Sequence, residues 1–117
     1  MFCNVDRALV GENELAIAFR DLYPVTSLHT LIIPKRHVSE YFDLYQPEMN
    51  AINQLINEVR NAILLADDTV EGFNIGTNAG EVSGQTVFHC HVHLIPRRRG
   101  VIPPLVTEFF SRGLRRH

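Results

Sequence analysis

Three histidines alternate with apolar residues near the carboxyl end of the chain, at His89, His91 and His93. If this segment is a strand, the three imidazoles share one face at a spacing of about 6.6 Å, while Phe88 and Cys90 point into the core. Because neighbouring imidazoles repel one another when protonated, we expect these to be mostly neutral at neutral pH. A neutral imidazole is a nucleophile and a general acid or base, so the pattern favours catalysis.

A glycine-bearing turn, residues 76–85, comes directly before the histidines. Its glycines free backbone N–H groups to point at an anion, and Asn78, Gln85 and Thr86 add neutral side-chain donors. Phosphoryl and nucleotidyl transfer depend mainly on positioning and on stabilising charge at the phosphate oxygens. A nucleophile and donors so close along the chain therefore indicate phosphate chemistry.

A metal site is the sharpest alternative interpretation of the three histidines. A His-x-His pair on a strand also suits zinc, with a third imidazole or a carboxylate completing the site. No carboxylate flanks the histidines along the chain to finish or orient such a site, which counts against zinc. A single histidine on a strand is usually an ordinary surface or core residue, so the repetition carries the argument.

Short strands and one long helix are expected to position these residues. Residues 8–10 and 15–19 are predicted strands joined by a turn at 11–14. Further strands are predicted at 29–33, ended by Pro34, at 72–75, and at 86–95, ended by Pro96. Apolar residues at spacings of three and four predict a helix from Pro47 to near Asp67, with one buried stripe. This order predicts an α+β layer architecture.

Composition indicates one ordinary globular domain. The chain has 117 residues, 45% of them apolar and 21% charged, which excludes wholesale disorder. Two cysteines, Cys3 and Cys90, cannot form a disulfide framework. No apolar run approaches the ~20 residues of a membrane span, and the first residues lack the pattern of a secretory signal. We therefore expect a cytoplasmic protein with no membrane association.

The charges are unevenly distributed along the chain. The formal net charge is −2, but the stretch from residue 97 onward holds six arginines against Glu108 alone. This basic tail could attract a polyanion, or could simply be solvated. Because the rest of the chain is acidic, general nucleic-acid binding is not expected. The six arginines are Arg97, Arg98, Arg99, Arg112, Arg115 and Arg116.

The segment from His89 to Ile95 matches the histidine-φ-histidine-φ-histidine-φ-φ signature of the histidine-triad family, where φ is apolar. Residues 19–24, 29–37 and 84–86, together with Asn78, also resemble the family's pattern, in the family's order. The resemblance spans residues 2–97 and implies a single domain over 1–117 with a basic tail at 98–117. It implies a five-stranded antiparallel sheet with one long and one short helix, paired into a homodimer.

The resemblance also implies roles for four histidines. His91 would attack the α-phosphate and form a covalent nucleotidyl-histidine, and His89 would position it through a backbone carbonyl contact. His93 would donate toward phosphate oxygens or the leaving group. His29 would support the other three without touching the substrate.

The remaining roles concern the nucleotide, which we expect to be a purine nucleotide. Asp21 would accept hydrogen bonds from the ribose hydroxyls, with Phe19 and Leu22 walling the base. Nucleoside phosphoramidates and dinucleoside polyphosphates are the expected substrates of this hydrolase or transferase. A nucleotide-binding scaffold with incidental catalysis, and a zinc-binding domain, are the alternatives. The phosphate, or the bridging atom of the leaving group, would be held by Asn78, Gly84, Gln85 and Thr86.

Three departures from the family pattern affect these expectations. Cys90 replaces a more usual aliphatic residue, which a buried thiol can imitate. Some members hold a structural zinc with an N-terminal Cys-x-x-Cys and two histidines, whereas here Cys3 stands alone beside His37 and His89. We therefore predict neither a metal nor another cofactor. Residues 101–104, Val-Ile-Pro-Pro, stand where many relatives carry an aspartate, in the segment that sets substrate choice.

Overall fold

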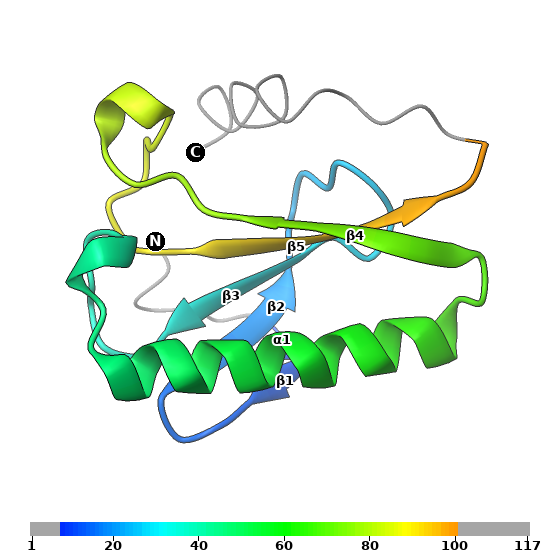
Figure 1. Ribbon diagram of the computed structural model, residues 1–117, viewed down its shortest axis with the longest axis horizontal. Coiled ribbons are helices and arrows are strands. Elements are labelled where there is room, and N and C mark those ends of the chain that lie inside the picture. Colours follow the sequence, from blue (N-terminus) through cyan, green and yellow to red (C-terminus); the bar gives the residue numbers. More distant parts are fainter. Residues whose placement is uncertain (1–7, 101–117) are drawn as a thin grey trace.

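The computed structural model describes residues 8–100, so Cys3 and the tail arginines Arg112, Arg115 and Arg116 lie outside the described residues. The described part forms a five-stranded antiparallel sheet, one long helix and two single-turn 3-10 helices (Figure 1). The predicted α+β fold is thereby confirmed. The strands are β1 (Gly11–Glu12), β2 (Ala16–Arg20), β3 (Thr30–Pro34), β4 (Val70–Gly76) and β5 (Val92–Arg98); the helices are η2 (Tyr41–Asp43), α1 (Gln46–Ala66) and η3 (Glu81–Ser83).

The strands lie in the order β1-β2-β3-β5-β4, and α1 covers one face of the sheet (Figure 1). The predicted helix is confirmed, with bounds one residue earlier at each end. Proline occupies its first turn, where the missing backbone N–H is not needed. Its buried stripe, predicted from the apolar spacing, packs on the sheet. The apolar residues of that stripe are Ile52, Leu55, Val59 and Ile63.

Two apolar clusters lie on opposite faces of the sheet. Ala18, Ile32 and Leu94 pack with the stripe of α1 in the larger cluster. Phe19 and Leu31, their neighbours along β2 and β3, belong to a second cluster. Because side chains alternate along a strand, the second cluster lies on the face turned away from α1. Residues that share this second face are available to build a site that the helix does not cover.

The first strand is shifted from its predicted position. We predicted residues 8–10 as the strand and 11–14 as the turn, but β1 is Gly11–Glu12 and pairs with Ala18 and Ile17 of β2. The side chain of Asn13 explains the shift, because its Oδ1 accepts hydrogen bonds from the N–H groups of Leu15 and Ala16. An asparagine that caps a turn in this way places the turn after β1.

The histidine strand begins later and ends later than predicted. We predicted residues 86–95, but β5 runs from Val92 to Arg98, so His89 and His91 precede it. In the segment before β5, the N–H of Cys90 donates to the carbonyl of Val38, which is not part of the sheet. Pro96 does not end the strand, because its carbonyl points toward Thr26 rather than toward a neighbouring strand. A residue's N and C=O point the same way in a strand, so no ladder bond is lost there.

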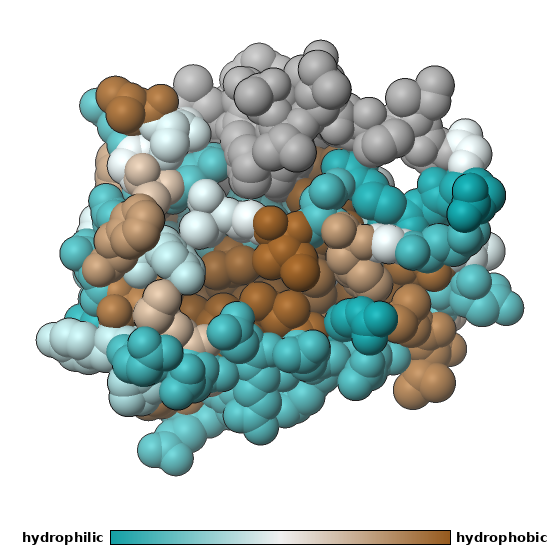
Figure 2. Space-filling view, viewed as in Figure 1, coloured by the Kyte–Doolittle hydropathy of each residue, from teal (hydrophilic) through white to brown (hydrophobic). Residues whose placement is uncertain are grey.

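The surface in Figure 2 is hydrophilic along the outer side of α1 and apolar between α1 and β4. β4 forms one edge of the sheet, where Ile75 is 57% exposed. Leu65, near the end of α1, is 90% exposed. Among residues 8–100, no helix combines the length and hydropathy that crossing a membrane requires.

Candidate active site

A row of paired residues runs across the sheet on the face away from α1. Phe19 of β2 pairs with Leu31 of β3, Leu31 pairs with His93 of β5, and His93 pairs with Gly76 of β4. Because directly paired residues in antiparallel strands point to the same face, His93 shares its face with Phe19 and Leu31. The sheet therefore fixes His93 beside the second apolar cluster.

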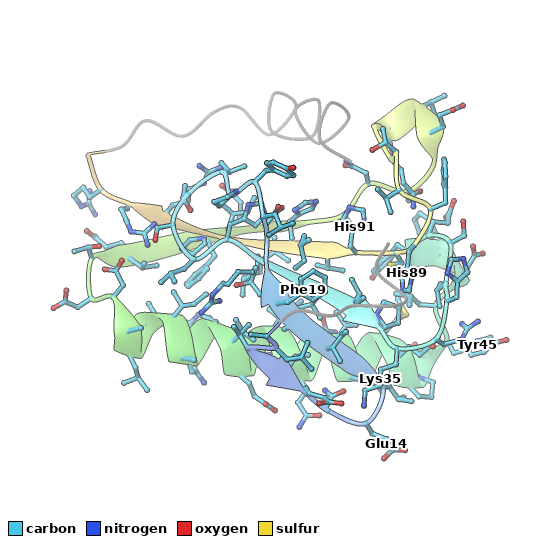
Figure 3. All side chains as sticks on the ribbon, turned by 180° about the vertical axis from the view of Figure 1, so that it is seen from behind. Glu14, Phe19, Lys35, Tyr45, His89 and His91 are labelled. Atoms are coloured by element: carbon cyan, nitrogen blue, oxygen red, sulfur yellow. The ribbon has the colours of Figure 1, made fainter. Side chains whose placement is uncertain are left out.

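His89 and His91 reach the site from the segment before β5 (Figure 3). The His91 and His93 rings lie 5.2 Å apart between centroids. The Nδ1 atom of His91 is 2.9 Å from the carbonyl oxygen of His89. A carbonyl only accepts, so Nδ1 carries the proton and the neutral ring keeps its lone pair on Nε2. The single-strand geometry predicted for all three histidines is wrong, and so is the core position predicted for Phe88, which is 49% exposed.

His29 lies just before β3 and contacts His93 directly. Its Nε2 is 2.9 Å from Nδ1 of His93, and the backbone N–H of Val25 donates to its Nδ1 at 3.0 Å. Since Val25 can only donate here, His29 accepts at Nδ1 and carries its proton on Nε2. That proton is donated to Nδ1 of His93, which leaves the remaining N–H of a neutral His93 on Nε2. Both histidines are buried.

A carboxylate joins this pair of histidines. Asp21 is buried, and its Oδ2 lies 3.5 Å from Nε2 of His29. One ligand-type atom from each of Asp21, His29 and His93 lies within 4.8 Å of the others. The carboxylate that is missing beside the histidines along the chain is therefore present in space, at the end of β2. The 2.9 Å His29–His93 contact is a hydrogen bond, and that bond uses the His93 lone pair that a metal ion would need.

The glycine-bearing segment between β4 and β5 is tied to the histidines at its start. The Thr77 hydroxyl donates to the carbonyl of His91 at 2.7 Å. Gly80 and Gly84 have φ values of 93° and 103°, a region that favours glycine. Asn78, two residues beyond the Gly76–His93 pair, is buried. The predicted donors thus lie on a segment that starts beside His93 and leads into His89.

Gln85 and Thr86 differ in how their polar groups are used. The Gln85 side chain accepts from the N–H of Gly80 and donates to the carbonyls of Ser39 and Val87. These bonds hold the loop together and occupy both its oxygen and its amide nitrogen. The Thr86 hydroxyl is buried and makes no hydrogen bond with any residue of the described range 8–100. Of the two side chains, Thr86 has the donor that is available to a ligand.

Burial shifts the pKa of two groups beside His91. Loss of water around His89 lowers its imidazole pKa, an effect that the hydrogen bond to the Pro34 carbonyl partly opposes and nearby His37 reinforces. Burial raises the pKa of the Cys90 thiol to about 12, with negative Glu40 adding to the effect. At neutral pH His89 is therefore held neutral and Cys90 is a protonated thiol.

The residues expected to contact the base differ in exposure. The Phe19 ring is fully buried in the second cluster, whereas Leu22 is 63% exposed. Leu22 therefore presents apolar surface, whereas Phe19 packs with Leu31 and Ile33 on the face of the sheet turned away from α1.

The first three tail arginines are engaged with the domain. Arg97 donates to the Asn74 side chain, Arg98 bonds Asp67, and Arg99 bonds Glu71. The charges of Arg98 and Arg99 are therefore paired with carboxylates, which reduces the field expected of this stretch.

Two of the residues that correspond to zinc ligands in some family members, His37 and His89, are in contact. The His37 and His89 rings pack edge to face at 5.0 Å, and Nε2 of His89 lies 3.2 Å from the Pro34 carbonyl. Cys3 lies outside the described residues, so the absence of a zinc site stays a prediction.

Comparison with known proteins places this geometry in a family. A family model described as the HIT domain matches residues 3–100. An uncharacterized HIT-like protein of Mycoplasma genitalium is 35% identical over 102 residues, covering 83% of this chain and 72% of that protein.

Two crystal structures share the fold. A HIT family protein from Bacillus anthracis has a TM-score of 0.77 and 34% identity, covering 99% of this chain and 89% of that chain. A hypothetical histidine triad nucleotide-binding protein from Sulfolobus tokodaii has a TM-score of 0.73 and 30% identity, covering 92% and 80%. The matched domain, the sequence relative and these structures agree with the histidine motif, and the chain belongs to the HIT family.

Proposed function

We propose that this protein cleaves a nucleoside phosphate derivative at the α-phosphate through a covalent nucleotidyl-histidine on His91. Membership of the HIT family supports nucleotide-binding hydrolase or transferase chemistry. The observation that carries the proposal is the 2.9 Å contact from Nδ1 of His91 to the His89 carbonyl. It leaves Nε2 of His91 as the nitrogen with a lone pair, which is the state a nucleophile needs.

In the proposed reaction, the Nε2 lone pair forms a bond to the α-phosphorus and the bond to the leaving group breaks with its electron pair. The phosphorylated ring becomes cationic, and the His89 carbonyl accepts from its Nδ1–H and stabilises that charge. Water, or another hydroxyl acceptor, then attacks the phosphorus and gives up a proton to solvent, which balances the proton that the leaving group takes up. The P–N bond breaks, its electron pair returns to Nε2, and the nucleotide is released.

Charge on the phosphate oxygens would be stabilised by hydrogen-bond donors around the site. His93 accepts from His29 at Nδ1 and so carries its own N–H on Nε2, and the buried Thr86 hydroxyl makes no bond within residues 8–100. A buried hydroxyl with no partner costs free energy that a bound phosphate oxygen would recover. Asn78 and the backbone around Gly84 complete the proposed phosphate site, and Gln85 supports it by holding the loop.

Recognition of the nucleoside follows from the family resemblance. Leu22 and Phe19 would wall a purine base, and Asp21 would lie toward the ribose. We propose nucleoside phosphoramidates and dinucleoside polyphosphates as the substrate classes. The additional negative charges of a polyphosphate substrate would interact with the arginine tail, and salt screens such interactions. Turnover of a polyphosphate should therefore fall with salt more steeply than turnover of a phosphoramidate.

Quenched-flow mass spectrometry with an adenosine phosphoramidate tests the proposal. The expected result is a nucleotidyl adduct on the peptide that contains His91, absent from His91→Ala. If adenosine monophosphate binds at micromolar concentration but neither substrate class turns over, the protein is a nucleotide-binding scaffold. Zinc retained at one equivalent after chelation, together with loss of structure when it is stripped, would establish a zinc-binding domain instead.

A further inference from the structure

We propose that Asp21 is a positioning residue that fixes the protons of His29 and His93. The consequence for turnover rests on the proposed function, whereas the proton positions are a property of the free protein. The geometry follows from the end of the β2–β3 pairing. The backbone N–H of Asp21 donates to the His29 carbonyl at 3.0 Å, one step beyond the Arg20–Thr30 pair. Asp21 and His29 therefore continue the alternation that places Phe19 and Leu31 on the histidine face.

One oxygen of the Asp21 carboxylate is fixed by a backbone hydrogen bond, and the other faces the His29 ring. Its Oδ1 accepts from the N–H of Tyr23 at 2.8 Å, and its Oδ2 lies 3.5 Å from Nε2 of His29. The side chain of Asp21 is 2% exposed and that of His29 is fully buried. With so little water to screen it, the negative charge acts strongly on the His29 ring.

Two groups then favour the same proton position on His29. The Val25 N–H donates to Nδ1, so the lone pair belongs there. A carboxylate oxygen beside Nε2 repels a lone pair and attracts an N–H, so the proton belongs on Nε2. From Nε2 it reaches Nδ1 of His93 at 2.9 Å. This order of protons leaves His93 with its N–H on Nε2, the atom proposed to face the phosphate.

This role differs from that of a ribose ligand. A residue that binds the ribose would contribute mainly to nucleotide affinity, and its loss would matter less for a substrate without ribose hydroxyls. A residue that sets the His93 proton would contribute mainly to kcat, by the same factor with or without those hydroxyls. The two roles therefore predict different kinetics for the same variant.

The first test is made on the free protein, by ¹⁵N NMR of the histidine rings. In the wild-type protein we expect His29 and His93 each to carry the proton on Nε2. In Asp21→Ala only the Val25 N–H still favours this proton order, so we expect a measurable fraction of His29 and His93 in the other ring tautomer. Asp68→Ala, at an exposed aspartate, should leave both rings unchanged. Asp21→Asn keeps an oxygen acceptor and is expected to retain most of the wild-type pattern. Unchanged rings in a folded Asp21→Ala protein would overturn the proposal; if that variant does not fold, unchanged rings together with unchanged kcat in Asp21→Asn would do so.

The second test compares an adenosine phosphoramidate with its 2′,3′-dideoxy analogue. We expect Asp21→Ala to lower kcat on the order of 10- to 100-fold on both substrates, and Asp21→Asn to restore part of it. A loss confined to KM, and present only with ribose hydroxyls, would make Asp21 a ribose ligand and overturn the proposal. If the wild-type protein shows the expected ring protons but turns over neither substrate, the proposed function fails and the positioning of His29 and His93 stands.

Discussion

The guanidinium of Arg36 forms two hydrogen bonds with the carboxylate of Glu48, at 2.9 and 2.8 Å. Glu48 also accepts from the N–H of Tyr45 at 2.8 Å, so one carboxylate caps the start of α1 and joins it to the segment after β3. His37, the next residue after Arg36, packs on His89. The contact thereby links the amino end of the helix to the surroundings of the site.

Replacing Glu48 with Gln should destabilise the protein and change its response to acid. The bonds from Arg36 and Tyr45 hold the Glu48 pKa below its usual 4.5, so the unfolded state binds more protons as the pH falls. This contribution to stability is complete above pH 4.5 and is lost as the pH falls through the lower folded-state pKa. Urea unfolding at pH 7 should show a loss of about 1–3 kcal/mol in Glu48→Gln.

The matched control is Glu58→Gln, at an exposed position of α1. This variant should have nearly the wild-type free energy of unfolding at pH 7. Between pH 5 and 3 it should lose as much stability as the wild-type protein does. In Glu48→Gln the loss of stability between pH 5 and 3 should be smaller, because the titrating carboxylate is gone. Parallel acid profiles for the Glu48 variant and the wild-type protein would contradict the assignment.

His29 and His93 should act as one unit in catalysis. We expect His93→Ala to slow turnover less severely than His91→Ala, and His29→Ala to slow it on the order of 10- to 100-fold. Because His29 acts through its bond to His93, the double variant should be little slower than His93→Ala alone. Measured kcat values for the four proteins decide the matter, and fully multiplicative losses would show that the two histidines act independently.

Periodicity was a good guide to α1, because an apolar stripe and a proline at the first turn are local signals. It misled at β5, because His89 and His91 continue the alternation of the strand without pairing in the sheet. What holds them is the bond from Cys90 to Val38 and the bond within the His89–His91 pair. Such contacts depend on where distant chain segments meet, which a local pattern does not contain.

The carboxylate at the site was missed for a similar reason. The family resemblance assigns Asp21 to the ribose, and the residues next to the histidines along the chain include no carboxylate. The signal was the alternation itself: positions 17, 19 and 21 of one strand face positions 29, 31 and 33 of the next. The predicted strand ends at residue 19, and only the observed register of its pairing with β3 places Asp21 beside His29.

Cys90 should resist alkylation in the folded protein. Its thiol is buried and its pKa is raised to about 12, so very little reactive thiolate exists at pH 8. We expect iodoacetamide to modify the peptide containing Cys90 roughly 100-fold or more slowly in buffer than in guanidinium chloride. Peptide mapping distinguishes this site from Cys3. Similar rates in the two solvents would mean that the segment before β5 opens readily.

The protein should form a homodimer in solution. β4 is an edge of the sheet with Ile75 exposed, and Leu65 is exposed near the end of α1. A second copy that covers this apolar surface would bury both side chains. Light scattering at micromolar concentration should give the mass of a dimer for the wild-type protein and of a monomer for Ile75→Asp. Phe42→Asp, at an exposed apolar position in η2, should remain dimeric. A monomeric wild-type protein would contradict the prediction.

His91→Ala should abolish turnover while leaving nucleotide binding nearly intact. The nucleophile contributes through the covalent intermediate, whereas ground-state affinity would come from the base, ribose and phosphate contacts. We expect kcat to fall by about 10³ or more, with the affinity for adenosine monophosphate changed by no more than a few-fold in calorimetry. Glu58→Ala, on the exposed side of α1, should match the wild-type protein in both measurements.

Added imidazole should restore activity to His91→Gly, because the vacated space lies beside the His89 carbonyl that orients the native ring. A diffusible imidazole that donates one N–H to this carbonyl would present its other nitrogen to the phosphorus, as Nε2 of His91 does. Rescue should saturate with imidazole concentration, and N-methylimidazole, which has no N–H, should rescue less well. Activity of His91→Ala within a few-fold of the wild-type rate, or a nucleotide found on another residue, would show that His91 is not the nucleophile.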